Sequence, residues 1–236
     1  MSELWSRLGF LAIALVVYRI GTHIPIPGIN PEQVAALFQQ SQGTILQYFN
    51  LFSGGALERM SIFALSVVPY ISSAIVMQLF SNSVPYLQEL KKDGQAGRNK
   101  ITQYTRYGTV IFALIQSSAL TVTLQTAGLI DAGSIFSAFT AVISIVTGTM
   151  FLMWLGEQIS ERGIGNGISI IIATSIITGV PRAFGQALEQ TQQGDLNYLL
   201  LIVLAVLTLL VVAFVVFVEN AQRKITVNYA QRNQVR

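Results

Sequence analysis

The sequence predicts an all-α, polytopic membrane protein, and three observations support that fold class. First, 52% of the 236 residues are hydrophobic and only 11% are charged, whereas soluble domains carry about 25% charged residues. Second, the mean hydropathy is +0.58. Third, the apolar residues gather in six runs, most of them close to the roughly 20 residues that a membrane-spanning helix needs.

The six predicted spans are separated by polar connections. The fifth run is short for a span, and Pro69 lies inside the second run, where a proline predicts a kink. In order along the chain, the runs are Leu4–Ile20, Ile62–Val84, Tyr107–Leu124, Ile135–Leu155, Gly167–Val180 and Leu196–Val218.

The positive charges predict how these helices are oriented. If the N-terminus is cytoplasmic, all of the 14 Lys and Arg residues except Arg19, Arg59 and Arg182 lie in cytoplasmic segments. Basic residues accumulate in the short cytoplasmic loops of membrane proteins. We therefore expect both termini of this chain to be cytoplasmic.

The composition excludes several classes of function. The five runs after the first contain no Asp, Glu, Lys, Arg or His, and ionisable residues within the membrane mark the pathways of pumps and coupled transporters. The chain has no cysteine, and His23 is its only histidine, which disfavours a histidine-based metal site or a catalytic triad. We predict no catalytic residue, no metal site and no cofactor. Uncharged polar residues such as Ser72, Ser73 and Gln116 predict hydrogen bonds between helices.

One further stretch, Ile45–Ile62, fits a helix but not a span. Its apolar residues fall at i, i+3, i+4, i+7 and i+11, the spacing of one helix face, at Ile45, Tyr48, Phe49, Phe52 and Ala56. The stretch is interrupted by Ser53-Gly54-Gly55 and carries Glu58 and Arg59, so it is too short and too polar to cross a bilayer. It must lie on the membrane surface or fold back into the protein as a stopper.

Several motifs together resemble one protein family. They extend in order over essentially the whole chain, and they are long. The motifs are Ile24–Gly28, Phe52–Leu57, Gln103–Thr109, Thr147–Ile159, Glu161–Ile172 and Val227–Ala230. Together they make the chain similar to the SecY family, the central subunit of the bacterial Sec protein translocase.

The resemblance implies a channel made of two inverted halves. SecY proteins have ten spans in two halves that are related by a pseudo-two-fold axis in the membrane plane, and this chain matches spans one to six. Residues 1–180 are then the first half-channel, residues 181–218 an outer loop and the sixth span, and residues 219–236 a basic cytoplasmic loop. Because the family continues beyond this loop, we expect the chain to be a fragment.

The resemblance also implies a function and its residues. The chain would be the pore-forming subunit of a protein-conducting channel in the bacterial cytoplasmic (inner) membrane, not an enzyme. It would pass unfolded secretory polypeptides across the membrane and release membrane segments laterally. The expected plug helix, at about 45–59, includes Ile45, Phe49, Phe52, Gly54 and Gly55. The expected apolar pore ring is Val67, Ile71, Ile168 and Ile172, and the expected lateral gate includes Ser72 and Gln116.

The basic residues of the cytoplasmic loops are the expected docking surface for cytosolic partners, although they are equally compatible with a role in topology alone. They are Lys91, Lys92, Arg98, Lys100, Arg106, Arg223 and Lys224. Because ribosomal RNA is anionic, such a surface suits a ribosome as well as the SecA motor. The resemblance implies SecE, SecG, SecDF, YidC, nascent chains, signal sequences and membrane lipid as further partners.

Two other functions remain open from the residues alone. A secondary transporter with broken helices is disfavoured by the uncharged spans. A structural membrane scaffold would use residues 45–59 as an interfacial helix.

Overall fold

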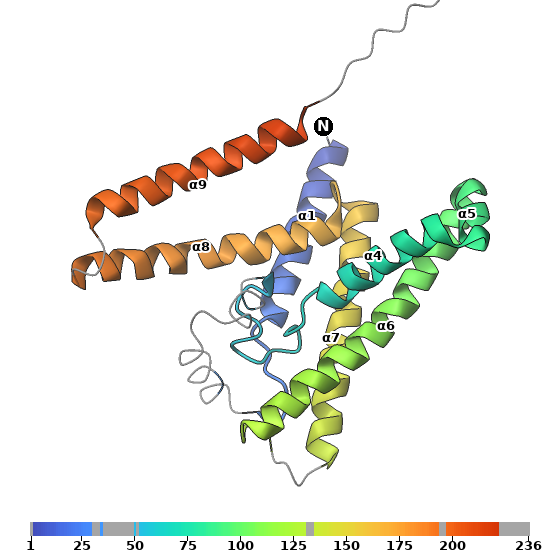
Figure 1. Ribbon diagram of the computed structural model, residues 1–236, viewed down its shortest axis with the longest axis horizontal. Coiled ribbons are helices and arrows are strands. Elements are labelled where there is room, and N and C mark those ends of the chain that lie inside the picture. Colours follow the sequence, from blue (N-terminus) through green and yellow to red (C-terminus); the bar gives the residue numbers. More distant parts are fainter. Residues whose placement is uncertain are drawn as a thin grey trace, which may run out of the picture. The chain divides into compact units, whose positions relative to one another are not determined.

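The computed structural model describes residues 2–29, 34, 50, 52–130, 135–193 and 197–221 (Figure 1). Within these residues the regular elements are helices, accompanied by one isolated β-bridge between Pro25 and Ser61. The helices are α1 (Ser2–Gly21), α4 (Val68–Ser83), α5 (Pro85–Lys92), α6 (Gly94–Thr126), α7 (Ile135–Arg162), α8 (Gly167–Gln193) and α9 (Tyr198–Glu219). The all-α prediction is confirmed.

Five of the described helices, α1, α6, α7, α8 and α9, are long and apolar enough to cross a membrane. The predicted number of six spans is therefore not confirmed. The difference lies in α4, which has 16 residues and so extends about 24 Å at 1.5 Å per residue, less than the roughly 30 Å hydrocarbon core.

The second predicted span begins at Val68 and not at Ile62. Residues 62–67 form turns, and Ser66 has a φ of 52°, a left-handed conformation that a helix cannot contain. Pro69 then occupies the first turn of α4, where the missing amide hydrogen costs nothing. The predicted kink at Pro69 is wrong, because this proline marks the start of the helix.

The segment between the second and third predicted spans is helical, contrary to the expected loop at Glu89–Arg106. α5 and the first turns of α6 form a hairpin around Asp93. The hairpin closes tightly, since a side chain at Gly97 would collide with the backbone carbonyl of Leu90. α4 and α5 pack along α6, and α6 packs along α7 (Figure 1).

α8 begins where the sequence predicted, at Gly167, but it ends at Gln193 and not at Val180. Its N-terminus is capped by the side-chain oxygen of Asn166, which accepts hydrogen bonds from the amides of Ile168 (3.1 Å) and Ser169 (3.3 Å). Pro181 lies inside the helix, and prolines are tolerated in membrane helices more readily than in soluble ones. The expected outer loop therefore begins as helix.

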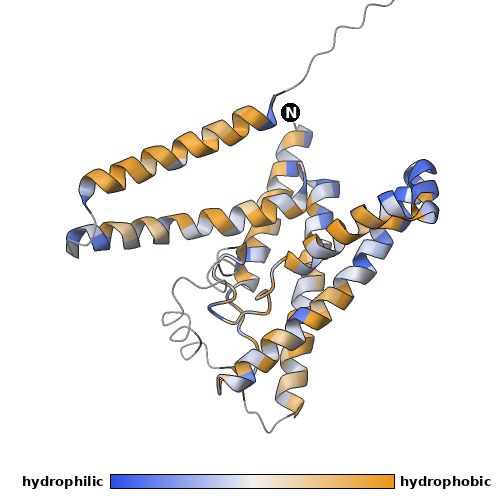
Figure 2. Ribbon diagram, viewed as in Figure 1, coloured by the Kyte–Doolittle hydropathy of each residue, from blue (hydrophilic) through white to orange (hydrophobic). Residues whose placement is uncertain are grey.

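The chain divides into two compact units, Met1–Pro181 and Arg182–Arg236. In the second unit, α9 is apolar over its whole length (Figure 2), as expected for a span. The first unit contains two apolar core clusters. The outer-connection cluster comprises Ile26, Ile29, Val34, Leu57, Met60, Ala64, Leu124, Ile130, Ala141 and Ile145. The central cluster comprises Ala14, Tyr18, Ala56, Phe63, Val67, Leu152, Leu155, Ile159 and Ile171.

Candidate functional site

Residues 52–67 are here named the re-entrant segment. Of the plug helix expected at about 45–59, residues 50 and 52 are helical, residues 53–59 form turns, and residues 45–49 and 51 lie outside the described residues. Gly54 and Gly55 have φ values of 65° and 80°, which are open to glycine but strained for other residues. The Ser53 hydroxyl donates to the carbonyl of Asn50 (3.0 Å) and accepts from the amide of Leu57 (3.1 Å). A side chain that bonds to nearby backbone in this way competes with helix formation.

The described part of the re-entrant segment is largely buried in the protein, which favours the inward placement over the membrane surface. Ala56, Leu57, Met60 and Phe63 are each at most 3% exposed, and they belong to both core clusters. Phe52, at the beginning of the segment, is 46% exposed. The other two predicted apolar plug residues, Ile45 and Phe49, lie outside the described residues.

The connection after α1 forms backbone hydrogen bonds with the re-entrant segment at Met60 and Ile62. The amide of Ile26 donates to the carbonyl of Met60 (2.8 Å), and the amide of Ile62 donates to the carbonyl of Ile24 (3.0 Å). These two hydrogen bonds flank the Pro25–Ser61 bridge. The proline-containing motif thus pairs with the segment through backbone and does more than form a rigid turn.

His23 adds a side-chain contact at the same place. Its Nε2 lies 3.0 Å from an Arg59 nitrogen, and its Nδ1 lies 2.9 Å from the carbonyl oxygen of Arg19. A guanidinium can only donate, and a carbonyl can only accept. The neutral imidazole with its hydrogen on Nδ1 satisfies both contacts.

The four predicted ring residues meet at the central cluster. Val67, the residue before α4, is 1% exposed and belongs to that cluster. Ile71 from α4, together with Ile168 and Ile172 from α8, is half-buried and packs against it. The four apolar side chains, which come from two regions far apart in the sequence, thus lie in or against the same cluster. Three of them keep an exposed part.

The predicted gate residues Ser72 and Gln116 are both half-buried, on α4 and α6 respectively. A hydrogen bond between these helices comes from the neighbouring Ser73, whose hydroxyl donates to the carbonyl of Thr105 (2.7 Å). The interhelical role expected for the uncharged polar residues is thus confirmed for Ser73. Whether Ser72 and Gln116 belong to a gate stays a prediction.

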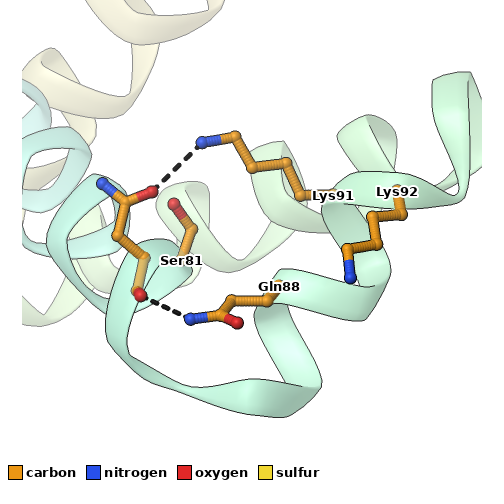
Figure 3. A pocket seen from close by; sticks show the side chains of 5 residues that line it. Ser81, Gln88, Lys91 and Lys92 are labelled. Carbon is orange, nitrogen blue, oxygen red and sulfur yellow. Dashed lines mark hydrogen bonds between the residues drawn. The ribbon is translucent and has the colours of Figure 1, made fainter.

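Four of the predicted docking residues, Lys91, Lys92, Arg98 and Lys100, are exposed on the α5–α6 hairpin. Figure 3 shows an open pocket of about 270 Å³ at its base, lined by Ser81, Asn82, Gln88, Lys91 and Lys92. The ammonium of Lys91 donates to the side-chain oxygen of Asn82 (3.2 Å), and the side-chain amide of Gln88 donates to the Asn82 carbonyl. The pocket is therefore lined by two basic side chains without an acidic one.

Arg106 differs from the other docking candidates. Its guanidinium forms a 2.8 Å ion pair with Glu157, which joins α6 to α7. The charge of Arg106 is therefore paired within the chain, although its side chain is 46% exposed. Arg223 and Lys224 lie outside the described residues. In the described part of the chain, no group of three or more His, Asp or Glu side chains is placed to hold a metal ion.

Sequence reasoning missed the polar side chains that hold the re-entrant segment from the other side. They are Tyr18, Arg19, Ser175 and Thr178. Tyr18 and Ser175 are both 0% exposed, and each lies in a predicted apolar run. The sequence did offer one signal for them, namely a hydroxyl-bearing residue inside an apolar run. Buried hydroxyls in membrane helices usually bond to another element or to their own helix.

Comparison with known proteins decides the family. The sequence model of SecY matches residues 61–236 of this chain. The chain belongs to the SecY family. It is a multi-pass membrane protein, as its apolar helices and its SecY relatives together show.

Curated SecY relatives match over the full length of the chain. The identity is 56% to the protein translocase subunit SecY of Pseudomonas aeruginosa and 54% to that of Escherichia coli K12. Each alignment covers 100% of this chain but only 53% and 54% of the respective relative. The chain thus spans about half the length of these SecY proteins.

Two solved structures share the fold of this SecY chain. One is Sec61 in the canine ribosome–channel complex from the endoplasmic reticulum, with a TM-score of 0.64. The other is described as a protein-conducting channel, with a TM-score of 0.65. Both are 21% identical in sequence, and each match covers 94% of this chain and 49% of the other.

Proposed function

We propose that this chain forms the first half of a protein-conducting channel. The channel passes unfolded secretory polypeptides across the bacterial cytoplasmic membrane and releases apolar segments sideways into lipid. The observation that carries the proposal is the re-entrant segment, which lies buried in the helix bundle of a SecY-family chain beside the ring candidates. In this proposal, residues 52–59 of the segment belong to the plug, Val67 at its end belongs to the ring, and both chain termini are cytoplasmic.

The physical character of the ring candidates supports the proposal. A polypeptide channel must admit many side chains, hold back ions and offer no strong binding site. An apolar constriction meets these requirements because water leaves it readily and no charge attracts the passing chain. Val67, Ile71, Ile168 and Ile172 are β-branched and stiff, so they suit such a constriction.

The proposed partners divide by the face of the membrane and by chemistry. Lys91, Lys92, Arg98 and Lys100 present positive charge to an anionic cytosolic surface, which suits a ribosome or SecA. SecE, SecG, SecDF and YidC are proposed as partners within the membrane. The chain has no catalytic constellation of its own in this proposal, so a partner supplies the energy for transport.

The decisive test is reconstitution of the complete channel. The full-length protein is placed in vesicles with SecE and SecG, and the SecA-driven protection of a preprotein from added protease is measured. We expect ATP-dependent protection. Uptake of a small solute without preprotein protection would instead support the secondary transporter. If neither activity were found, the structural membrane scaffold would be favoured.

The same vesicles test the ring. Val67→Asp places a charge in a site that is 1% exposed, where an unpaired charge holds water and opens the constriction to ions. We expect a higher ion leak, while Ile71→Leu, which stays apolar, keeps the seal. An unchanged ion conductance in Val67→Asp would contradict the assignment of Val67 and Ile71 to the pore ring.

A further inference from the structure

The re-entrant segment has two carbonyl groups that contact side chains of helix α1. The carbonyl oxygen of Ser53 lies 3.4 Å from the hydroxyl of Tyr18. The carbonyl oxygen of Gly54 lies 3.4 Å from a guanidinium nitrogen of Arg19. The Ser53 carbonyl also accepts from the amide of Ala56 within the turn (3.3 Å), whereas Arg19 supplies the partner that the buried Gly54 carbonyl needs. Together the two contacts join the turn at Ser53-Gly54 to α1.

α8 lies directly against the same turn. The Tyr18 hydroxyl also lies 2.5 Å from the Ser175 hydroxyl oxygen, and the Arg19 guanidinium also donates to the Thr178 hydroxyl oxygen (3.4 Å). The backbone of Gly54 touches α8 so closely that an added Cβ would stand 3.2 Å from the Cα of Ser175. The turn is therefore held where α1 and α8 meet.

The hydroxyl hydrogens allow two arrangements. Each hydroxyl donates one hydrogen, and the Ser175 hydroxyl can also donate to the carbonyl of Ile171 on its own helix (2.8 Å). In one arrangement, Ser175 donates to Ile171 and Tyr18 donates to Ser175. In the other, Ser175 donates to Tyr18, and Tyr18 donates to Ser53. The second arrangement alone ties the turn to α1 through Tyr18.

We propose that Tyr18 and Arg19, which also contact Ser175 and Thr178 of α8, form a latch that holds the re-entrant segment closed through the carbonyls of Ser53 and Gly54. The proposal rests on the proposed function in one respect, because it names what keeps the proposed plug in place. Tyr18 and Arg19 are positioning residues, because their side chains reach the segment's backbone. Closure therefore depends on few polar contacts as well as on the apolar burial around Ala56.

The chain offers a clean reporter because it contains no cysteine. Ala56 is 0% exposed in the closed arrangement. In Ala56→Cys, a water-soluble maleimide can therefore reach the thiol only when the segment opens. The rate of labelling in proteoliposomes then measures the population of the open form, provided that the segment recloses faster than the reagent reacts.

The expected results differ among the variants. Tyr18→Phe keeps the ring that stacks on Phe63 but loses the hydroxyl, and we expect labelling to rise about 3- to 10-fold. Arg19→Gln removes a charged donor, which makes stronger hydrogen bonds than a neutral one, and we expect a rise of about 10-fold or more. Tyr104→Phe, at an exposed tyrosine of α6, is the matched control and should leave the rate unchanged.

Ser175→Ala separates the latch from simple packing. This variant removes the competing acceptor, so the Tyr18 hydrogen is left with the Ser53 carbonyl as its partner. We expect labelling that is unchanged or slower. A rise in Ser175→Ala as large as that in Tyr18→Phe would overturn this account of the hydrogens, and no rise in either Tyr18→Phe or Arg19→Gln would overturn the latch.

A second measurement guards against a reporter that fails to fold. Amide hydrogen exchange of residues 55–62 is compared between the cysteine-free chain and its Tyr18→Phe variant, and we expect faster exchange in the variant. Neither measurement needs transport. If the latch variants open the segment but do not change ion leak in the assembled channel, the latch stands and the plug function fails.

Discussion

The re-entrant segment and the α5–α6 hairpin (residues 85–106) are the two connections on either side of α4, and they differ in how they satisfy their backbone. The hairpin is almost wholly helical, so most of its amides and carbonyls bond within it. The re-entrant segment is a series of turns with internal hydrogen bonds, such as that from the amide of Ser61 to the carbonyl of Ala56 (2.9 Å). It is also joined to α1 through the carbonyls of Ser53 and Gly54, and to residues 24–26 through Met60 and Ile62. The segment therefore adds bonds to distant residues to those of its own turns.

This difference places the moving part and the docking part of the proposed channel in separate regions. A segment that is held by long-range contacts can be released when those contacts break. A hairpin that is held by its own hydrogen bonds and by the burial of Leu87 and Leu90 can carry exposed charge to a partner without changing shape. Variants should therefore affect one region and spare the other.

The largest effect on the segment is expected from Gly54→Ala. The φ of 65° costs an alanine roughly 1–2 kcal/mol, and its Cβ would crowd the α8 backbone at 3.2 Å from the Ser175 Cα. We expect the maleimide labelling of the Ala56→Cys reporter to rise at least 10-fold, since 1.4 kcal/mol is tenfold in an equilibrium.

Gly55→Ala is the matched control for that substitution. Its φ of 80° is also left-handed, but the added Cβ would stand 3.0 Å from the mobile end of the Arg59 side chain. It has the backbone strain without the collision with α8, so the rise in labelling should be smaller. Equal rises in the two variants would mean that the contact with α8 contributes nothing to closure.

The next effect concerns the hairpin. Neutralising Lys91, Lys92, Arg98 and Lys100 to Gln should weaken ribosome binding by the complete channel. The slope of log affinity against log salt should become shallower by about 0.7–0.9 for each RNA phosphate that the variant no longer neutralises. The labelling of the Ala56→Cys reporter should stay the same.

Arg106→Gln provides the contrast within the same hairpin. Because Arg106 is paired with Glu157 at 2.8 Å, its loss should loosen the contact between α6 and α7 and leave the salt slope almost unchanged. The fourfold variant changes the salt slope by a certain amount per neutralised residue. If Arg106→Gln changed the slope by as much, the separation of the paired Arg106 from the four docking residues would be contradicted. No change in slope in the fourfold variant would reject the electrostatic docking surface.

The same comparison explains what could be predicted from the sequence. Apolar runs are local signals, so the starts of α7 and α8 were predicted at Ile135 and Gly167. The family motifs led to a pore ring that stays a prediction, although Val67 belongs to the central cluster and the other three candidates pack against it. Hydrophobicity alone could not show that residues 62–67 are turns, because the left-handed Ser66 is set by packing and not by residue type.

The latch lay outside the reach of pattern reasoning for a related reason. Tyr18 and Ser175 are 157 positions apart in the chain, and nothing in their local sequence couples them. The helical hairpin was missed for the opposite reason. Gly94 and Asp93 look like a loop, but one tight turn is enough to reverse the chain, and the buried Leu87 and Leu90 then dock the short α5.

The smallest effect should come from Ser66, at the boundary between the re-entrant segment and α4. Its φ of 52° is strained for a serine, and its buried hydroxyl has no hydrogen-bond partner. Ser66→Ala removes only the orphaned hydroxyl, whereas Ser66→Gly also relieves the left-handed strain, by about 1 kcal/mol after allowing for the extra flexibility of the unfolded glycine. If the strain is released on opening, Ser66→Gly should slow labelling of the Ala56→Cys reporter several-fold more than Ser66→Ala does. Equal labelling rates in the two variants would mean that Ser66 does not move when the segment opens. The hinge would then lie between the latched turn at Ser53-Gly54 and Met60, which also has a positive φ of 44°.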